Sequence, residues 1–184
     1  HEFTTKVFTN NFIINKGLLE GDLFIKGFGN SVFKFNDFDS LVSLITAAGI
    51  KSIKGNIFAD NSYFDELYTR DDWIIDERAN VKLPPISALV VNRNQLVISL
   101  LAIGSYGSKI RYSIYPECSF INVEMNAKVS KNRSYPRISS SFKKNGMIIK
   151  VNGGLRKRRT PRRYAINITN PPKFFALYLK EQLQ

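Results

Sequence analysis

Seven short segments with the side-chain pattern of β-strands follow one another between residues 86 and 168. Most are separated by turn-forming pieces such as residues 104–107 and 152–154, which are rich in Gly or Asn. Regularly spaced short strands of this kind are typical of a small β-sandwich or barrel. Asn145-Gly146 also predicts a two-residue hairpin. The predicted strands cover residues 86–91, 95–102, 109–115, 120–127, 135–142, 147–151 and 163–168.

The first part of the chain has a different pattern. Residues 37–48 have helical spacing, with Leu41, Leu44, Ile45 and Ala48 on one face and Gly49 just beyond the end. Asn36 or Asp37 is expected to cap this helix. Strands are predicted on either side of it, at residues 2–9, 23–25 and 50–59.

The chain ends on a second predicted helix. Asn170 is its expected cap, followed by Pro171 and Pro172, and Phe174, Leu177 and Tyr178 share a face. Strand, helix and strand within residues 20–60 predict an α/β or α+β unit, and the order of the elements predicts that an all-β unit interrupts it.

The composition of the chain excludes several kinds of covalent, metal and catalytic site. Cys118 and His1 are the only residues of their types, so an internal disulfide, a Cys₂His₂ or Cys₄ zinc site and an internal histidine base are excluded. Residues 1–77 carry 7 basic and 12 acidic residues, whereas residues 78–184 carry 20 and 3. Such asymmetry indicates two units with different surroundings, or a basic face that meets an anionic partner. No cofactor or metal is predicted.

The chain begins without Met, which suggests a fragment or a processed product. No signal peptide is expected, because residues 1–3 already belong to a strand-like pattern. No apolar run approaches the length of a membrane span, so no transmembrane segment is predicted.

Several segments, in order, resemble one family. They resemble the motifs G-D-L-Y-x-x-G-x-G, A-G-I-x-x-I-x-G, D-[DN]-S-x-F-D, a W-x-x-D pair followed by P-I-S-A-L, and D-P-x-x-[FY]-[FA]-A. The matching residues are 21–29, 47–55, 60–65, Trp73 with Asp76, 85–89 and 170–176, and Asn92-Arg93-Asn94 follows the fifth of these segments. This series is similar to the class C low-molecular-mass penicillin-binding proteins, which are D-alanyl-D-alanine carboxypeptidases and endopeptidases.

The resemblance implies a fold and a place in a larger enzyme. The family inserts two domains between the first and second catalytic motifs of a serine transpeptidase-like domain, and this chain resembles the insert alone. Residues 1–93 plus 169–184 would form the outer α+β domain, an antiparallel sheet with helices. Residues 94–168 would form a nested all-β domain. The implied location is the periplasm or cell envelope of a bacterium, and the implied partner is the peptidoglycan stem peptide.

Two positions depart from the family pattern. The G-x-G-D-P turn of the family is Gly27-Phe28-Gly29-Asn30-Ser31 here, and its tyrosine after the W-x-x-D pair is replaced near Val81.

The family's nucleophile lies in S-x-x-K, with S-x-N and K-[ST]-G completing the cleft. Ser31/Lys34, Ser140/Lys143 and Ser141/Lys144 fit the first pattern, and Ser130-Lys131-Asn132 fits the second. Chance explains such strings in a chain with 16 Ser and 16 Lys, and no K-[ST]-G occurs. We therefore predict no catalytic residue in this chain, and the serine chemistry would belong to the full-length parent.

Trp73 and Asp76 are the predicted substrate-binding residues of the parent. In the family, this segment leans over the cleft and holds the amino-bearing end of the stem-peptide side chain. A carboxylate suits an ammonium group, and an aromatic ring covers an aliphatic stem. The alternatives are that Trp73 is a core residue and that Asp76 pairs with Arg78 or caps a turn.

Two further groups of residues could be taken for sites. Asp60, Ser62 and Asp65 are predicted to form a turn rather than a metal or acid/base site, with side chains bonded to nearby N–H groups. Gly27 and Gly29 lack the remainder of a phosphate-binding loop.

A basic run is the strongest surface signal in the sequence. It could be a solvated hairpin loop, a contact for anionic envelope polymers or lipids, or the binding surface of a β-rich nucleic-acid-binding module using residues 156–163. No known nucleic-acid-binding motif accompanies it, although Tyr135 and Tyr164 could stack bases. The predicted contact residues are Arg156, Lys157, Arg158, Arg159, Arg162 and Arg163.

Overall fold

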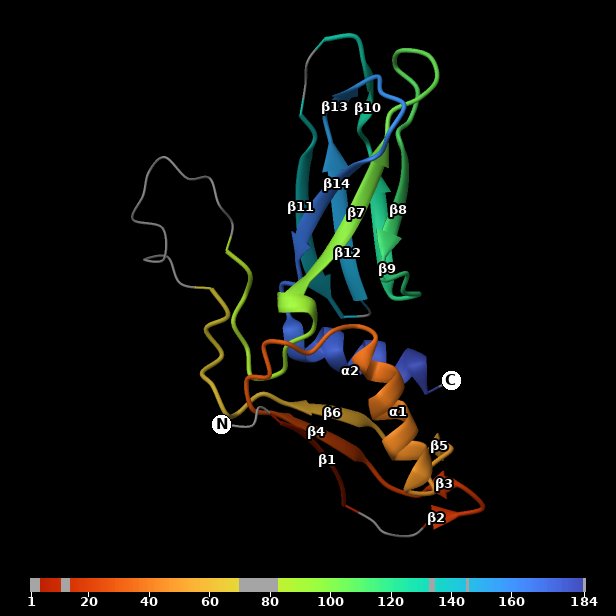
Figure 1. Ribbon diagram of the computed structural model, residues 1–184, viewed down its shortest axis with the longest axis vertical. Helices are drawn as coiled ribbons and strands as arrows, with labels where there is room; N and C mark the ends of the chain where they lie inside the picture. Colours follow the sequence, from red (N-terminus) through yellow and green to blue (C-terminus); the bar gives the residue numbers. More distant parts are fainter. Residues whose placement is uncertain (1–3, 11–13, 70–82, 133–134, 145, 184) are drawn as a thin grey trace. The chain divides into compact units, whose positions relative to one another are not determined.

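The computed structural model describes residues 4–10, 14–69, 83–132, 135–144 and 146–183. The chain folds into two compact units: residues 1–94 with 170–184 (unit 1), and residues 95–169 (unit 2). Helices occur in unit 1 and strands in both units (Figure 1), so the predicted α+β class is confirmed.

Unit 1 is built on a three-stranded sheet in the order β1-β4-β6. Strand β1 (Thr5–Thr9) pairs antiparallel with β4 (Leu23–Gly27), and β4 pairs parallel with β6 (Ile57–Asp60). The expected antiparallel sheet is therefore mixed. The reason is the helix α1 (Asp37–Ala47), which connects β4 to β6 as a crossover and returns the chain in the same direction.

A second small sheet completes the strands of unit 1. It contains β2 (Ile14–Asn15), β3 (Leu18–Leu19) and β5 (Ser52–Ile53). The expected strand over residues 50–59 is thus divided between β5 and β6. The division falls near Gly55, where a Cβ would lie 2.4 Å from the Gly21 carbonyl oxygen. Only glycine permits the two backbone segments to approach so closely.

Helix α1 ends as its sequence predicts. Gly49 has a φ of +91°, and the N–H groups of Gly49 and Ile50 donate to the carbonyls of Thr46 and Ile45. This is the Schellman arrangement, in which a left-handed glycine satisfies the last carbonyls. The predicted apolar face is only partly correct, because Leu41 and Ile45 are buried whereas Leu44 is 70% exposed.

An aromatic cluster forms the core between α1 and α2 (Pro171–Gln182). Both helices lie on the same face of the β1-β4-β6 sheet (Figure 1). The Phe38 ring lies 4.6 Å from Phe175 and 4.7 Å from Tyr178, centroid to centroid. The predicted cap of α2 is confirmed, because Asn170 Oδ1 accepts a hydrogen bond from the Lys173 N–H at 3.1 Å. Leu177, expected on the buried face, is half-buried.

The described residues of unit 2 form strands and the loops between them, with no helix. One sheet has the order β14-β7-β8, a second has the order β11-β12-β9, and β10 and β13 form a short pair. The bounds are β7 Gln95–Leu101, β8 Arg111–Tyr115, β9 Ile121–Met125, β10 Lys128–Ser130, β11 Arg137–Lys143, β12 Gly146–Asn152, β13 Gly154–Arg156 and β14 Arg162–Asn167.

Alternation along the strands builds the core of unit 2. Leu96, Ile98 and Leu100 of β7 are fully buried, and so are the three apolar residues Met147, Ile149 and Val151 of β12. Six of the seven strands predicted from residue 86 onward are present, within a few residues. The predicted strand over residues 86–91 is wrong, because this segment is irregular. Its preceding prolines, Pro84 and Pro85, have no N–H to offer a sheet.

Candidate functional site

A pocket of about 800 Å³ opens in unit 1 beside the irregular segment that replaces the expected strand. Its walls are mostly apolar, and Arg93 is the one charged residue among the described residues that line it. The lining residues are Gly29, Ser31, Val32, Phe64, Leu83, Pro84, Pro85, Ile86, Ser87, Val90, Arg93 and Asn94. A concave apolar surface with a few polar groups is the usual form of a ligand site.

The predicted substrate-binding residues Trp73 and Asp76 lie outside the described residues, as do Arg78 and Val81. The residues on either side of that segment are described. The Ile86 N–H donates to the Tyr68 carbonyl at 2.9 Å, which brings the two ends of the segment together. Leu83, the first described residue after that segment, lines the pocket together with Ile86.

Two buried asparagines hold the irregular wall of the pocket. Asn61 Oδ1 accepts hydrogen bonds from the N–H groups of Ala88 at 2.8 Å and Leu89 at 3.2 Å. Asn94 Nδ2 donates to the Pro85 carbonyl at 2.9 Å and to Ser87 Oγ at 3.1 Å. The side chains thus satisfy backbone groups that a sheet would otherwise have to pair, as buried polar groups require.

A left-handed turn presents Arg93 at the pocket. Asn92, Arg93 and Asn94 have φ values of 48°, 57° and 54°. Asparagine tolerates this conformation, but for arginine it costs about 1–2 kcal/mol. The turn is held by the Asn94 hydrogen bonds and by the Asn92 N–H, which donates to the Phe33 carbonyl at 2.7 Å. Arg93 itself is exposed.

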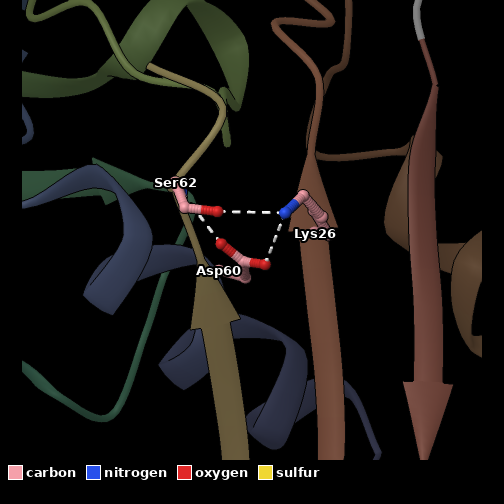
Figure 2. A network of polar contacts seen from close by, with 3 residues as sticks. All are labelled: Lys26, Asp60 and Ser62. Carbon is pink, nitrogen blue, oxygen red and sulfur yellow. Dashed lines mark hydrogen bonds and ion pairs between the residues drawn. The ribbon is translucent and has the colours of Figure 1, made fainter. Parts of the chain in front are cut away.

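The D-[DN]-S segment forms the predicted turn and a polar network with β4 (Figure 2). Asp60 Oδ1 accepts a hydrogen bond from the Ser62 N–H at 2.8 Å. Lys26 Nζ lies 3.0 Å from Asp60 Oδ2 and donates to Ser62 Oγ at 2.9 Å. Hydrogen bonds from the Ser62 hydroxyl, the Ser62 N–H and Lys26 lower the pKa of Asp60 to about 2. Asp65, the third residue of the expected turn, is exposed.

Two of the S-x-x-K strings begin on β11 and the third begins in a turn. Ser140 and Lys143 both belong to β11, where residues three apart point to opposite faces of the sheet. Ser140 Oγ also donates to the Asn167 carbonyl at 2.8 Å. Ser31 lies in a turn, not at the start of a buried helix. Ser130 of the S-x-N string donates its hydroxyl to the Asn132 carbonyl at 3.0 Å.

The basic residues of the run 156–163 fall into two groups by their exposure to solvent. Arg156, Lys157, Arg159 and Arg163 are exposed, whereas Arg158 and Arg162 are half-buried. The Arg162 guanidinium carbon lies 5.0 Å from the Tyr135 ring centre and 5.4 Å from that of Tyr164. Both distances are within the range of cation–π attraction.

Within the described part of the chain, no three His, Cys, Asp or Glu residues are grouped to hold a metal ion. The helices there are also too short and too polar for a bilayer crossing.

Asn61 and Asn94 are the site residues that the sequence patterns did not identify. Asn61 is the central residue of the D-[DN]-S segment, in which only Asp60 and Ser62 were predicted to form side-chain hydrogen bonds. Asn94 ends the Asn92-Arg93-Asn94 segment. An asparagine beside an apolar strand is the available signal, but sequence does not tell which distant backbone groups it will bond.

Comparisons with known proteins agree with this fold. The family model described as the D-Ala-D-Ala carboxypeptidase 3 (S13) family matches residues 1–184. A D-alanyl-D-alanine carboxypeptidase of Actinomadura sp. (strain R39) is 29% identical over 91 residues, which cover 50% of this chain and 17% of that protein.

Solved structures are similar over a greater length. The crystal structure of penicillin binding protein 4 (dacB) from Haemophilus influenzae matches 98% of this chain with a TM-score of 0.76 and 20% identity. The same protein in complex with a β-lactam matches 98% of this chain with a TM-score of 0.70. This chain covers 40% and 37% of those two chains, and therefore spans less than half of the relatives that it matches. By its match over residues 1–184, the chain belongs to the D-Ala-D-Ala carboxypeptidase 3 (S13) family.

Proposed function

We propose that this chain is the non-catalytic insert of a serine-type peptidoglycan D-Ala-D-Ala carboxypeptidase or endopeptidase of the cell envelope. The observation that carries the proposal is the family match over residues 1–184. The S-x-x-K strings of this chain begin on a strand and in a turn, which supports a non-catalytic role. The outer domain would comprise residues 1–93 plus 169–184, and the inner domain residues 94–168. The parent would cleave a bond after D-Ala by serine acyl transfer, and the insert would shape its substrate cleft.

The outer face of the unit 1 sheet supports a role inside a larger protein. Phe8 lies opposite Phe24, and Phe24 lies opposite Phe58, so three phenylalanines cross the sheet in register. The Phe24 and Phe58 rings stack with centroids 5.1 Å apart. Phe8 and Phe58 remain 48% and 46% exposed. An exposed aromatic stripe of this kind marks an interaction surface, and we assign it to the rest of the parent polypeptide.

In the parent, the Trp73 and Asp76 segment would form one wall of the cleft. The Asp76 carboxylate would pair with the ammonium group at the end of a stem-peptide side chain, and Trp73 would cover the aliphatic part. The adjoining apolar pocket, with walls fixed by Asn61 and Asn94, supports this assignment. Leu83, which directly follows the segment, is part of the lining of this concave surface.

Penicillin acylation tests the insert assignment. A fluorescent β-lactam should label the full-length parent at its S-x-x-K serine and leave the isolated 184-residue chain unlabelled. Labelling of the isolated chain at Ser31 would overturn the assignment.

Steady-state kinetics of the parent test the cleft wall. We expect Asp76→Asn to raise KM for a peptide whose side chain ends in an amine by about tenfold, which corresponds to one lost charged pair. The same peptide with an acetylated amine is the matched control, because wild type and variant should then have equal KM. Equal KM values on the free amine would refute the role of Asp76.

A further inference from the structure

Three segments meet at one end of unit 2. Strand β10 pairs in parallel with β13, which places Lys128 opposite Gly154 and Ser130 opposite Arg156. Lys109 forms a bridge with Lys128, and the Arg158 N–H donates to the Ala102 carbonyl at 2.9 Å. Residues 102–111, 126–132 and 153–163 are therefore neighbours, around the β10 and β13 labels in Figure 1.

These segments carry only positive charge. Neither Asp nor Glu occurs in them, and unit 2 as a whole has 15 basic and 2 acidic residues. Glu124, one of the two, is paired with Lys150 at 3.1 Å outside these segments. We call their basic residues the cationic end: Lys109, Arg111, Lys128, Lys131, Arg156, Lys157, Arg158, Arg159, Arg162 and Arg163. All but Arg158 and Arg162 are exposed.

The two half-buried arginines of the cationic end, Arg158 and Arg162, are held by contacts with neighbouring side chains. Arg162 is held against the Tyr135 and Tyr164 rings, and Arg158 Nη2 lies 3.3 Å from Thr160 Oγ1. Arg158 Nε and the Tyr164 hydroxyl are both buried without a hydrogen-bond partner in the described structure. Buried donors without a protein partner are uncommon, and a bound water or ion would satisfy them.

A cluster of like charges without acidic neighbours repels itself, and an anionic partner relieves that repulsion. A charge set spread over three segments suits a polymer better than a single small anion. The large apolar side chains exposed in the described part of unit 2 are all tyrosines, namely Tyr106, Tyr112, Tyr115 and Tyr135. A bilayer-binding surface normally adds aliphatic or Trp/Phe anchors. Arg162 lies over the Tyr135 and Tyr164 rings, and no known nucleic-acid-binding motif accompanies these residues.

We propose that the cationic end binds a linear, non-nucleic polyanion with closely spaced phosphate groups. Arginine and lysine would neutralise successive phosphates and release their counterions, so affinity depends on salt. Assignment of this polymer to the cell envelope, where it would hold the parent near its substrate, rests on the proposed function. Binding of the polymer itself rests on the charges of unit 2.

Titration of the 184-residue chain with fluorescently labelled long-chain inorganic polyphosphate tests the proposal, with anisotropy as readout. We expect binding at about 0.15 M salt that weakens steeply as salt rises. The triple variant R156E/K157E/R159E should weaken binding by about tenfold or more and flatten the salt dependence. The control K34E/K51E/K54E makes the same change in net charge on exposed lysines of unit 1 and should retain binding.

The remaining outcomes decide against the proposal. Equal weakening by both triple variants would show that net charge, not the cationic end, binds the polymer. Tighter binding per phosphate to duplex DNA would identify a nucleic-acid-binding module, and tighter binding to phosphatidylglycerol vesicles would identify a membrane contact. If the glutamate variant unfolds by circular dichroism, R156Q/K157Q/R159Q provides the same comparison. Polyphosphate binding is measured without substrate, so its failure is distinct from failure of the Asp76 experiment.

Discussion

Asn61 and Ala88, 27 positions apart in the sequence, are joined by a hydrogen bond of 2.8 Å from the Ala88 N–H to the Asn61 side-chain oxygen. The same oxygen accepts the Leu89 N–H. One side chain therefore connects the turn after β6 to the irregular wall of the pocket. Residues 87–89 of this wall are buried but belong to no sheet, so their order depends on such side-chain acceptors.

Replacing Asn61 by Ala should destabilise unit 1. The change removes the acceptor of two buried N–H groups, and each orphaned buried donor costs about 1–3 kcal/mol. Urea unfolding should give a loss of about 2–4 kcal/mol for N61A. N152A, which removes an exposed amide bonded to Asn126, should change stability by less than about 0.5 kcal/mol. Similar losses in the two variants would contradict the role of Asn61.

Asp60 should make stability depend on pH in the acid range. Its pKa is about 2 in the folded protein against an ordinary value of 3.8, so the folded state is stabilised above pH 3.8. As pH falls from 3.8 toward 2, the unfolded state takes up the proton first and the stabilisation is lost. We expect an effect on the order of 1 kcal/mol, because the side chain is 35% exposed and water screens its charge.

The Asp60 effect can be measured in two ways. An NMR titration of the Asp60 carboxyl carbon should have its midpoint near pH 2. D60N should remove part of the acid-induced loss of stability, whereas D39N, on the exposed surface of α1, should change it much less. An Asp60 midpoint at the ordinary value would exclude the network in Figure 2 from the solution structure.

Position 93 should prefer glycine to alanine. Because Arg93 has a φ of 57°, any residue with a Cβ bears the cost of the left-handed conformation, whereas glycine does not. R93G should be about 1 kcal/mol more stable than R93A. The matched pair at Ser43, an exposed position inside α1, should show the reverse order, with S43A about 1 kcal/mol more stable than S43G. The same order at both positions would mean that the turn at 92–94 is not left-handed in solution.

The cap of α2 should contribute measurably to the free energy of unfolding. N170A removes the acceptor of the Lys173 N–H at the start of the helix and should cost about 1 kcal/mol in thermal or urea unfolding. N170D retains a capping oxygen and should recover most of the loss. A deficit in N170D as large as that in N170A would indicate that the Asn170 side chain contributes nothing as a cap.

The local features of the fold could be predicted from the sequence. Gly49 ends α1 and Asn170 begins α2 as expected, because caps depend on a few adjacent residues. The side-chain cap expected at the start of α1 is wrong, because Asn36 makes no side-chain cap hydrogen bond and the Asp37 carboxylate accepts the Lys34 N–H instead. The alternating apolar residues of β7 and β12 predicted their strands and their buried faces. The family could also be recognised from short motifs, and the match over residues 1–184 confirms it.

Predictions that depend on distant contacts were less accurate. Leu44 fits the apolar spacing of α1 but is exposed, because the neighbouring elements cover the side of the helix that carries Phe38, Leu41 and Ile45. Residues 86–91 have the composition of a strand, yet the side chains of Asn61 and Asn94 accept hydrogen bonds from the backbone N–H groups of Ala88, Leu89 and Val91 in place of a sheet. Strands β10 and β13 have three residues each, too few for a periodic signal.

The amount of charge in each part of the chain, the positions of caps and turns, and the motifs of the family all follow from the amino-acid sequence, because they are local or additive properties. The network of Lys26, Asp60 and Ser62 and the gathering of the cationic end from three separate segments depend instead on tertiary structure. The physical reason is that parallel pairing, as between β10 and β13, joins residues far apart in the chain, and no local pattern specifies their register.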